Sequence, residues 1–519
     1  MTKPAEALAA SAPGVEGPWA RPASRSLASS AFSSLAGIGA GEVLVALACF
    51  LVLCAAVLMH PPKLVEQDSY AYRASIVALS EGHVTLSTSQ YQELRRRLIA
   101  SDGDHGIGIG QWVRLADGKW VSEKNPGYPF FAVPFQLLGA LGLAPLFYGA
   151  LACAGLFFGG RRWLGRWGGV WAAGLFCSSG AAMLFAWRET MPTFTESSLL
   201  AAGTGALLWA VLAGEAGARA RTIAGLLGFL ALEGAMFVRY TDVVVLGCGV
   251  VAVLVAGWLT SISLPRRALL WWVGSAVVFG LFVLAFDRAV YGHAFSTGYG
   301  PGIFTFGLGA LSGNLAHMPL HLTKAIPAFW LALVGIVWIV ARDLRLRGLV
   351  RADALFGRAG ANGARTALAA ADRDLAVGAS LAASWLGIWG LYAMYYWSAR
   401  TSAGAYSTLQ VVRFFVPSLA PIALLAAWPL ARAPRRLAGA ALVAFFALGL
   451  WSFTAVRTGG FVTSGGMPRE PSAASGGGGA QKAPPGPQSP QPQGRQQPGQ
   501  QRSGQKAPGQ PAPPGASPT

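Results

Sequence analysis

The chain has 519 residues, of which 53% are hydrophobic and only 12% charged, and its mean hydropathy is +0.46. Soluble proteins carry about 25% charged residues, so this composition excludes an ordinary soluble protein and predicts a polytopic membrane protein. The net charge of +18 does not predict a nucleic-acid binder, because the basic residues fall between apolar runs rather than on one soluble face. The five cysteines lie inside apolar runs without a CxxC pair, which predicts neither a disulfide framework nor a cysteine metal site.

The N-terminal stretch, residues 1–41, is rich in Ala, Ser, Pro and Gly and predicts a disordered tail. The first apolar run follows at about residues 43–59 and is long enough to cross a bilayer core of about 30 Å. It ends at Pro61 and Pro62, which lack the amide hydrogen that a continuing helix needs. This run is therefore the first predicted transmembrane helix.

A long polar region then covers residues 61–128. It is too hydrophilic for hydrocarbon and too long for a simple connector, which is typical of a functional loop. Within it, residues 69–80 and 91–99 have apolar side chains at helical spacing. They predict two juxtamembrane amphipathic helices that lie on the membrane surface.

Apolar runs separated by short charged breaks fill the next part of the chain. The predicted spans are 129–158, 168–186, 195–213, 222–238, 243–260, 268–286, 327–341, 375–396, 412–430 and 437–455. With the first run they make about eleven transmembrane helices in an all-α membrane domain at residues 42–456. Gly139 or Gly142 is expected to break the second span.

The arginines predict the orientation of the helices in a plasma membrane. They concentrate in alternate connections, above all in residues 342–374, so these connections and the N-terminus are expected to be cytoplasmic. The loop at residues 61–128 and the tail at residues 457–519 are then extracytoplasmic. The tail is rich in Pro, Gly and Gln and predicts disorder.

The six histidines all fall in or beside the predicted outer loops, which places any chemistry on the outer face. Soluble nucleotide sugars and ATP are cytoplasmic, so an enzyme on that face needs a donor that the membrane itself delivers. We therefore expect membrane lipids to be partners of this site.

Several motifs along the chain together resemble one family. The main ones are residues 67–72 (QDSYAY), just after the first helix, and 123–129 (EKNPGYP), at the start of the second. Weaker ones are residues 195–196, 238–241, 291–299 and 412–417. Over about residues 43–430 the chain resembles the GT-C integral-membrane glycosyltransferases, in the group of the bacterial aminoarabinose transferases and protein O-mannosyltransferases. The resemblance implies a GT-C-like fold and a polyprenyl-phosphate-linked sugar as donor.

Asp68 is the catalytic base that this resemblance implies. Transfer with inversion needs a carboxylate to take the acceptor hydroxyl's proton, and one general base contributes about 10²–10⁴ in rate. The alternative is that Asp68 only caps the following helix. The family often has two adjacent acidic residues here, whereas this chain has Glu66 two positions earlier.

Three cations are predicted to bind the donor phosphate, namely Lys124, Arg239 and Arg413, because a fixed cation stabilises the charge that develops on a leaving phosphate. The alternatives are a lysine that reaches to lipid headgroups and arginines that anchor helix ends. Other residues that could line the substrate cavity are Glu66, Tyr72, Tyr128, Glu189, Glu196, Tyr291 and Tyr299.

Metal-binding patterns are weak in this sequence. Residues 102–104 have DxD spacing but lie in a Gly-rich outer loop, and His317 and His321 flank Pro319, which disfavours a regular helix. No metal site is assigned, no cofactor is certain, and a divalent metal ion stays open.

The predicted function is transfer of a sugar from a polyprenyl-phosphate donor to a hydroxyl of a glycan, lipid or protein acceptor, on the extracytoplasmic face and with inversion. The alternatives are a multi-pass transporter or lipid flippase, for which no internal repeat is evident, and a scaffold that presents the C-terminal tail. No nucleic-acid partner is expected.

Overall fold

The computed structural model describes residues 39–59, 67–102, 111–213, 216–259, 266–295, 298, 305–356, 361–403 and 411–457. They belong to one compact unit, Met1–Gly465. The predicted tails lie almost wholly outside the described residues, as do Glu66 and Tyr299.

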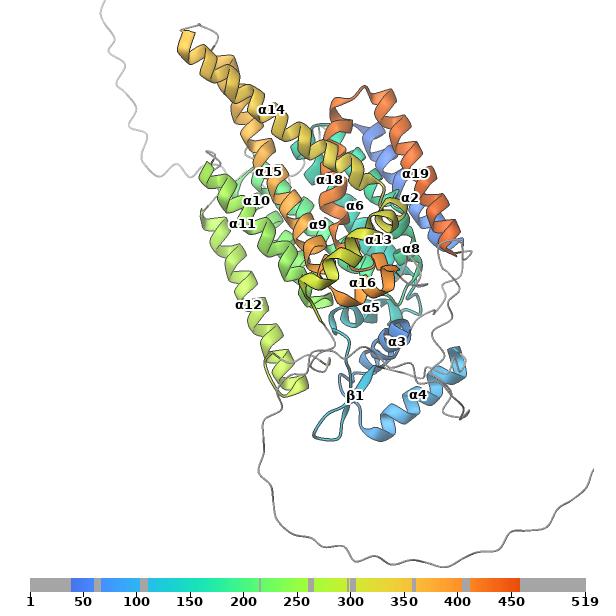
Figure 1. Cartoon of the computed structure of the whole chain (residues 1–519). Coiled ribbons are helices and arrows are strands. Elements are labelled where there is room, and N and C mark those ends of the chain that lie inside the picture. Colours follow the sequence, from blue (N-terminus) through green and yellow to red (C-terminus); the bar gives the residue numbers. More distant parts are fainter. Residues whose placement is uncertain are drawn as a thin grey trace, which may run out of the picture. The chain divides into compact units, whose positions relative to one another are not determined.

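Helices make up nearly all of the described chain (Figure 1). Up to the midpoint they are α2 (Ala40–Leu58), α3 (Gln67–Ser80), α4 (Thr88–Asp102), α5 (Gly127–Leu137), α6 (Leu143–Leu164), α7 (Gly168–Cys177), α8 (Gly180–Trp187), α9 (Pro192–Leu212), α10 (Ala218–Val238), η1 (Tyr240–Asp242) and α11 (Val243–Leu259). Then follow α12 (Arg266–Tyr291), η2 (Leu308–Ala310), α13 (Leu311–Ala325), α14 (Ala328–Phe356), α15 (Ala361–Ala393), α16 (Tyr396–Ala403), η3 (Val416–Ser418), α18 (Leu419–Arg432) and α19 (Arg435–Arg457). Strands β1 (Trp112–Arg114) and β2 (Trp120–Ser122) form an antiparallel hairpin in which Trp112 pairs with Ser122.

Seven described helices are long and apolar enough to cross a membrane, and up to nine if each of two bent pairs forms one span. Shorter apolar helices at Tyr240–Ala252 and Val416–Arg432 coincide with two further predicted spans. The all-α polytopic class is therefore confirmed, while the count of eleven and the orientation stay predictions.

Two of the predicted spans are broken. The second divides into α5 and α6 as expected, and Gly139 has a φ of +66 at the break. The third was expected to be continuous, but α7 and α8 meet at a bend of 57°. The bend falls at Ser178, Ser179 and Gly180, and Gly/Ser pairs are common sites of helix kinks.

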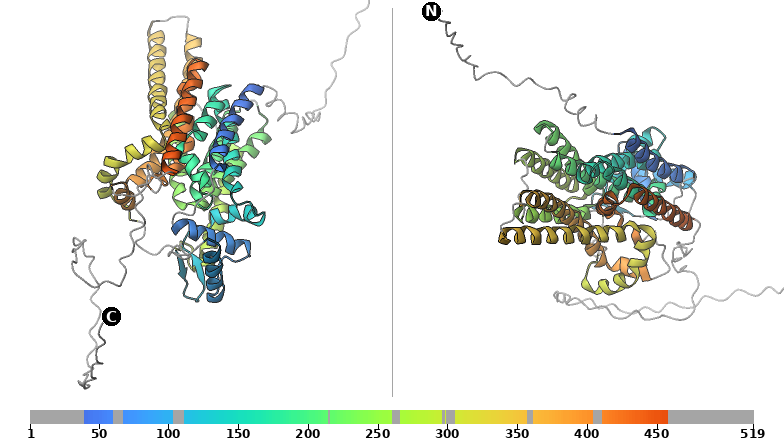
Figure 2. Two further views of the ribbon diagram at one scale, coloured as in Figure 1. Left: turned by 90° about the vertical axis from the view of Figure 1, so that its right-hand side faces the viewer. Right: turned by 90° about the horizontal axis from the view of Figure 1, so that it is seen from above.

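The segment 342–374 is helical over most of its length rather than an irregular loop. Helices α14 and α15 continue through it and project together beyond their neighbours (Figures 1 and 2). Ion pairs support these extensions. Arg347 lies 2.7 Å from Asp343 one turn earlier, and Asp374 of α15 accepts hydrogen bonds from Arg342 and Arg432 at 2.6 and 3.1 Å.

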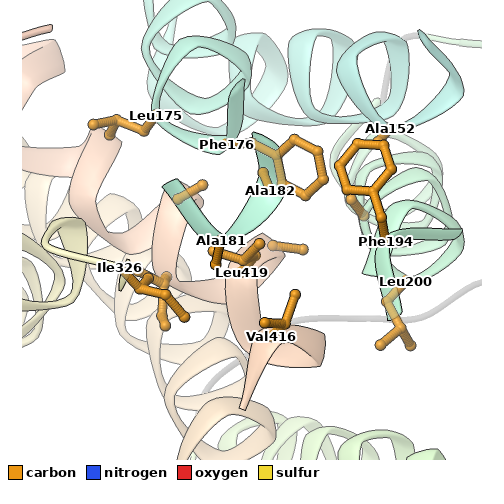
Figure 3. Packing of buried hydrophobic residues seen from close by; sticks show 14 of the residues in the cluster. Ala152, Leu175, Phe176, Ala181, Ala182, Phe194, Leu200, Ile326, Val416 and Leu419 are labelled. Atoms are coloured by element: carbon orange, nitrogen blue, oxygen red, sulfur yellow. The ribbon is translucent and has the colours of Figure 1, made fainter. Parts of the chain in front are cut away.

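The main core is built around α7, α8 and α18. Every residue of α7 and α8 is buried, as is Leu419–Leu430 of α18. Figure 3 shows this packing, in which Phe176 and Phe194 lie with ring centroids 5.9 Å apart. These elements are therefore covered by protein on all sides and form the centre of the helical packing.

Helices α6 and α9 pack closely through glycines. A Cβ on Gly155 would lie 2.7 Å from Cα of Ala202, and one on Gly159 would lie 2.7 Å from Cα of Gly205. Gly155 and Gly159 form a GxxxG pattern, which lets two helices approach at backbone distance in a membrane.

The first polar region forms a small substructure at the end opposite the α14–α15 projection (Figure 1). Helices α3 and α4 and the hairpin share an apolar cluster of Ala74, Ala78, Leu86, Leu94, Leu98 and Trp112. The apolar face of α4 is thus used inside the protein, whereas the sequence predicted that it lies on the membrane. Helix α3 also packs on α5, where Arg73 donates a hydrogen bond of 3.2 Å to the side chain of Gln136.

Candidate active site

Asp68 lies in the first turn of α3 and contacts two cations from distant parts of the chain. Its Oδ1 is 3.0 Å from Nζ of Lys124, and its Oδ2 accepts a hydrogen bond of 2.6 Å from Nη1 of Arg413. The side chain of Gln111 is a further hydrogen-bond partner. Helix α3 begins at Gln67, one residue before Asp68, so the carboxylate does not act as the N-cap that was the alternative prediction.

The turn after β2 places Lys124 at this site. Its backbone N–H donates to Oγ of Ser122 at 3.1 Å, and the N–H of Glu123 donates to the carbonyl of Gln111 at 2.9 Å. Gln111 has a φ of +67, a conformation that non-glycine residues rarely adopt. Pro126 then begins the turn into α5. The motif at residues 123–129 thus links the hairpin to the membrane helices with its lysine facing α3.

Aromatic rings hold the guanidinium of Arg413. Its Cζ lies 4.8 Å from the ring centroids of both Trp397 and Phe414. Cation–π contacts of this kind contribute about 0.5–2 kcal/mol each. Trp397 and Phe414 were not among the predicted site residues, although Phe414 belongs to the motif at residues 412–417, because an aromatic ring in an apolar stretch is most often a core residue.

The two cations determine the protonation of Asp68. Burial alone would raise its pKa, but the charges of Arg413 and Lys124 outweigh burial and hold the pKa of Asp68 well below its usual range. The carboxylate is therefore ionised at neutral pH, as a proton acceptor must be.

Glu123 is a second carboxylate at the same site. Its Oε1 lies 3.7 Å from Nζ of Lys124, so Lys124 stands between Asp68 and Glu123. Burial raises the pKa of Glu123, Lys124 lowers it and Asp68 raises it, with a net increase. Glu123 was not among the predicted site residues, although its position next to Lys124 in the motif at residues 123–129 was a usable signal.

Arg239 forms a separate centre. Its Nη1 is 3.0 Å from Oε2 of Glu196, at an angle that does not meet hydrogen-bond geometry, and Asp242 lies beside the pair. Both carboxylates are fully buried. The Cζ of Arg239 is 5.4 Å from the ring centroid of Phe414, which also contacts Arg413. The centres around Arg239 and Arg413 therefore both contact the ring of Phe414. A role for Arg239 as a phosphate ligand stays a prediction.

The other predicted cavity residues lie around these centres. Tyr72 and Tyr128 pack edge to face at 6.0 Å, and the hydroxyl of Tyr128 donates to the carbonyl of Glu189. The hydroxyl of Tyr291 donates to the carbonyl of Ser122 at 3.4 Å, next to Glu123. Glu66 and Tyr299 lie outside the described residues.

A cleft adjoins Lys124 on the side of the hairpin. It is lined by residues of α3, the hairpin and α12, among them His83, Trp112, Ser122 and Tyr291.

Metal ligands do not cluster in the described part of the chain, where no group of three His, Cys, Asp or Glu side chains could hold an ion. Helix α13 runs through Pro319, although the sequence predicted an interruption there. His317 and His321 are therefore on one helix, and residues 103–104 of the DxD pattern lie outside the described residues.

Comparison of the sequence with protein-family models gives no match, and neither does comparison with curated protein sequences. Among solved structures, the fold is similar to the crystal structure of the apo form of the Archaeoglobus fulgidus oligosaccharyltransferase, with a TM-score of 0.42 and 11% sequence identity. The likeness covers 80% of this chain and 56% of that chain, so this chain spans little more than half of its length. A likeness of this size carries no argument about function, which is argued below from the site.

Proposed function

We propose that the protein is an integral-membrane glycosyltransferase that transfers a sugar from a polyprenyl-phosphate donor to an acceptor hydroxyl, with inversion, on the extracytoplasmic face. The observation that supports it is the contact of one ionised carboxylate, Asp68, with two cations, Lys124 and Arg413. A general base beside a phosphate-binding pair is what this reaction needs.

In this mechanism the acceptor oxygen forms a bond to the anomeric carbon while Asp68 takes the hydroxyl proton. The bond between the anomeric carbon and the phosphate oxygen breaks, and its electron pair stays on the phosphate. Lys124 and Arg413 stabilise the charge that develops there. Their positions on either side of Asp68 bring donor and base together, which lowers the entropy cost of the encounter.

The resemblance described for the sequence supports the same roles, because its two main motifs supply Asp68 and Lys124. The low-dielectric surroundings of Asp68 and Lys124 also favour these roles. These two side chains are 15% and 7% exposed, so their charges act with little screening by water.

The test is transfer by the purified protein in liposomes with a panel of defined polyprenyl-phosphate sugars. The panel follows mass spectrometry of glycans from a deletion strain. Asp68→Asn is expected to lower the transfer rate by about 10²–10⁴. The matched control is Asp117→Asn, because Asp117 is an exposed hairpin residue paired with Lys119 at 3.1 Å. Unchanged transfer by correctly inserted Asp68→Asn protein would exclude this role.

A transporter or lipid flippase is the second candidate. Two helix pairs are bent by 57° and 101°, and discontinuous helices are common in transporters. This candidate predicts that liposomes containing the protein translocate a fluorescent polyprenyl phosphate but transfer no sugar.

A further inference from the structure

Four ionisable side chains meet at the proposed active site, and their formal charges cancel when both carboxylates are ionised. Asp68 and Glu123 then contribute two negative charges, and Lys124 and Arg413 contribute two positive charges. All four side chains are between 7% and 15% exposed. A phosphodiester would bring one more negative charge into this half-closed space, where an uncompensated charge is costly.

Of the two carboxylates, Glu123 is the less strongly stabilised in its ionised form. Asp68 is in contact with both cations and with Gln111. Glu123 has one cation, at 3.7 Å, which is beyond hydrogen-bond distance. A phosphate on Lys124 would neutralise that cation and repel Glu123, and both effects favour the neutral acid.

We propose that Glu123 is the proton-binding residue of the donor site, which takes up one proton when a phosphodiester binds Lys124 and Arg413. The proton comes from solvent, and no bond other than O–H forms. The site then remains neutral with the donor in place, and the new O–H can donate a hydrogen bond to a phosphate oxygen. This rests on the proposed function, since it takes the donor phosphate as the ligand of the two cations.

The neighbouring segments add further titratable side chains, among them Asp287 of α12, which accepts a hydrogen bond of 3.0 Å from Tyr240 and lies near Tyr291. Burial raises the pKa of Tyr395, which lies near Lys124 and Asp68, and Tyr291 of α12 bonds Ser122. His83 lines the cleft beside Lys124 and lies 3.2 Å from Nε2 of Gln90. The tyrosines stay neutral below pH 9. His83→Gln is the control for the imidazole that lines the cleft, and Asp287→Asn is the control for the carboxylate of α12.

The experiment is calorimetric titration of the full-length protein in lipid nanodiscs. The probe is farnesyl methyl phosphodiester, which has a single charge and does not itself titrate between pH 5 and 9. Titrations in two buffers of different ionisation enthalpy give the number of protons taken up. The number of protons taken up is expected to approach about one per bound phosphodiester at its maximum. Between the pKa of Glu123 in the free protein and its higher pKa in the complex, the Kd should rise by up to about tenfold per pH unit.

Glu123→Gln is expected to remove this proton uptake and to make the Kd independent of pH, because glutamine is permanently neutral. Glu123→Asp should keep the uptake, and so should His83→Gln. No uptake by the wild-type protein at any pH, or equal uptake by Glu123→Gln, would overturn the inference. If uptake is lost only in His83→Gln, the proton belongs to His83 and the inference is also wrong.

The proposed function is tested separately by Asp68→Asn, which should lose transfer. This variant also removes one negative charge from the site, so we expect its proton uptake on binding the phosphodiester to be smaller than that of the wild type. Retained transfer would refute the proposed function. Loss of transfer by Asp68→Asn, combined with no proton uptake by the wild type, would refute only the inference about Glu123.

Discussion

The guanidinium of Arg413 donates a hydrogen bond of 2.6 Å to the carboxylate of Asp68, although 345 positions separate the two residues in the sequence. Asp68 lies in the first turn of α3 and Arg413 precedes the last two α-helices, so the bond joins an early and a late segment of the chain.

Arg413→Lys keeps the charge but loses the planar fork that can bind Asp68 and a phosphate together. We expect its donor KM to rise by about tenfold, and that of Arg413→Gln by about 10²-fold, since a charge-assisted hydrogen bond contributes about 1.5–3 kcal/mol. Initial-rate kinetics over donor concentration measure both. Arg436→Gln is the control, because Arg436 is an exposed residue at the start of α19. An equal rise of the donor KM in this variant would argue against a specific role of Arg413.

Trp397→Ala removes one ring that holds the Arg413 guanidinium at 4.8 Å. We expect kcat/KM for the donor to fall by about 3- to 30-fold, which corresponds to a cation–π contribution of about 0.5–2 kcal/mol. Trp397→Phe retains an aromatic face and should recover most of the loss. If both variants behave alike, the ring is not what positions Arg413.

Asp68 makes a pH-dependent contribution to stability. Because the surrounding cations lower its pKa in the folded protein, its ionisation stabilises the fold above the unfolded value of about 4, and this contribution is lost as the pH falls from there toward the folded pKa. The difference in Tm between the wild type and Asp68→Asn should therefore be constant from pH 8 to about 5 and shrink below about 4. A difference that grows on acidification would contradict the assignment.

Gly159→Ala tests the contact between α6 and α9. The added Cβ would meet the backbone of Gly205, and overpacking of this kind lowers stability by about 1–3 kcal/mol. Thermal unfolding in detergent should show a lower Tm for this variant. Gly280→Ala is the matched control, because a Cβ there meets no atom within 4 Å; a similar loss in both would mean that the helical position, not the contact, is responsible.

Much of the fold could be predicted from local sequence. The run at residues 43–59, the break at Gly139 and the helix that begins beside Asp68 each depend on a short segment. The bend between α7 and α8 was missed, because Ser178, Ser179 and Gly180 permit a kink without requiring one. The continuous helix through Pro319 was missed, because a proline disfavours a helix without excluding it.

The sequence by itself determined that this is a polytopic membrane protein with a polar first loop, since hydropathy and segment length add up residue by residue. It also singled out Asp68 and Lys124 as candidates. Only the tertiary structure decided that Lys124 and Arg413 share Asp68, that Glu123 faces the same ammonium, and that Arg239 instead pairs with Glu196. These contacts depend on the packing of segments far apart in the chain, and the charge of a side chain alone does not specify which partner the fold brings within 4 Å of it.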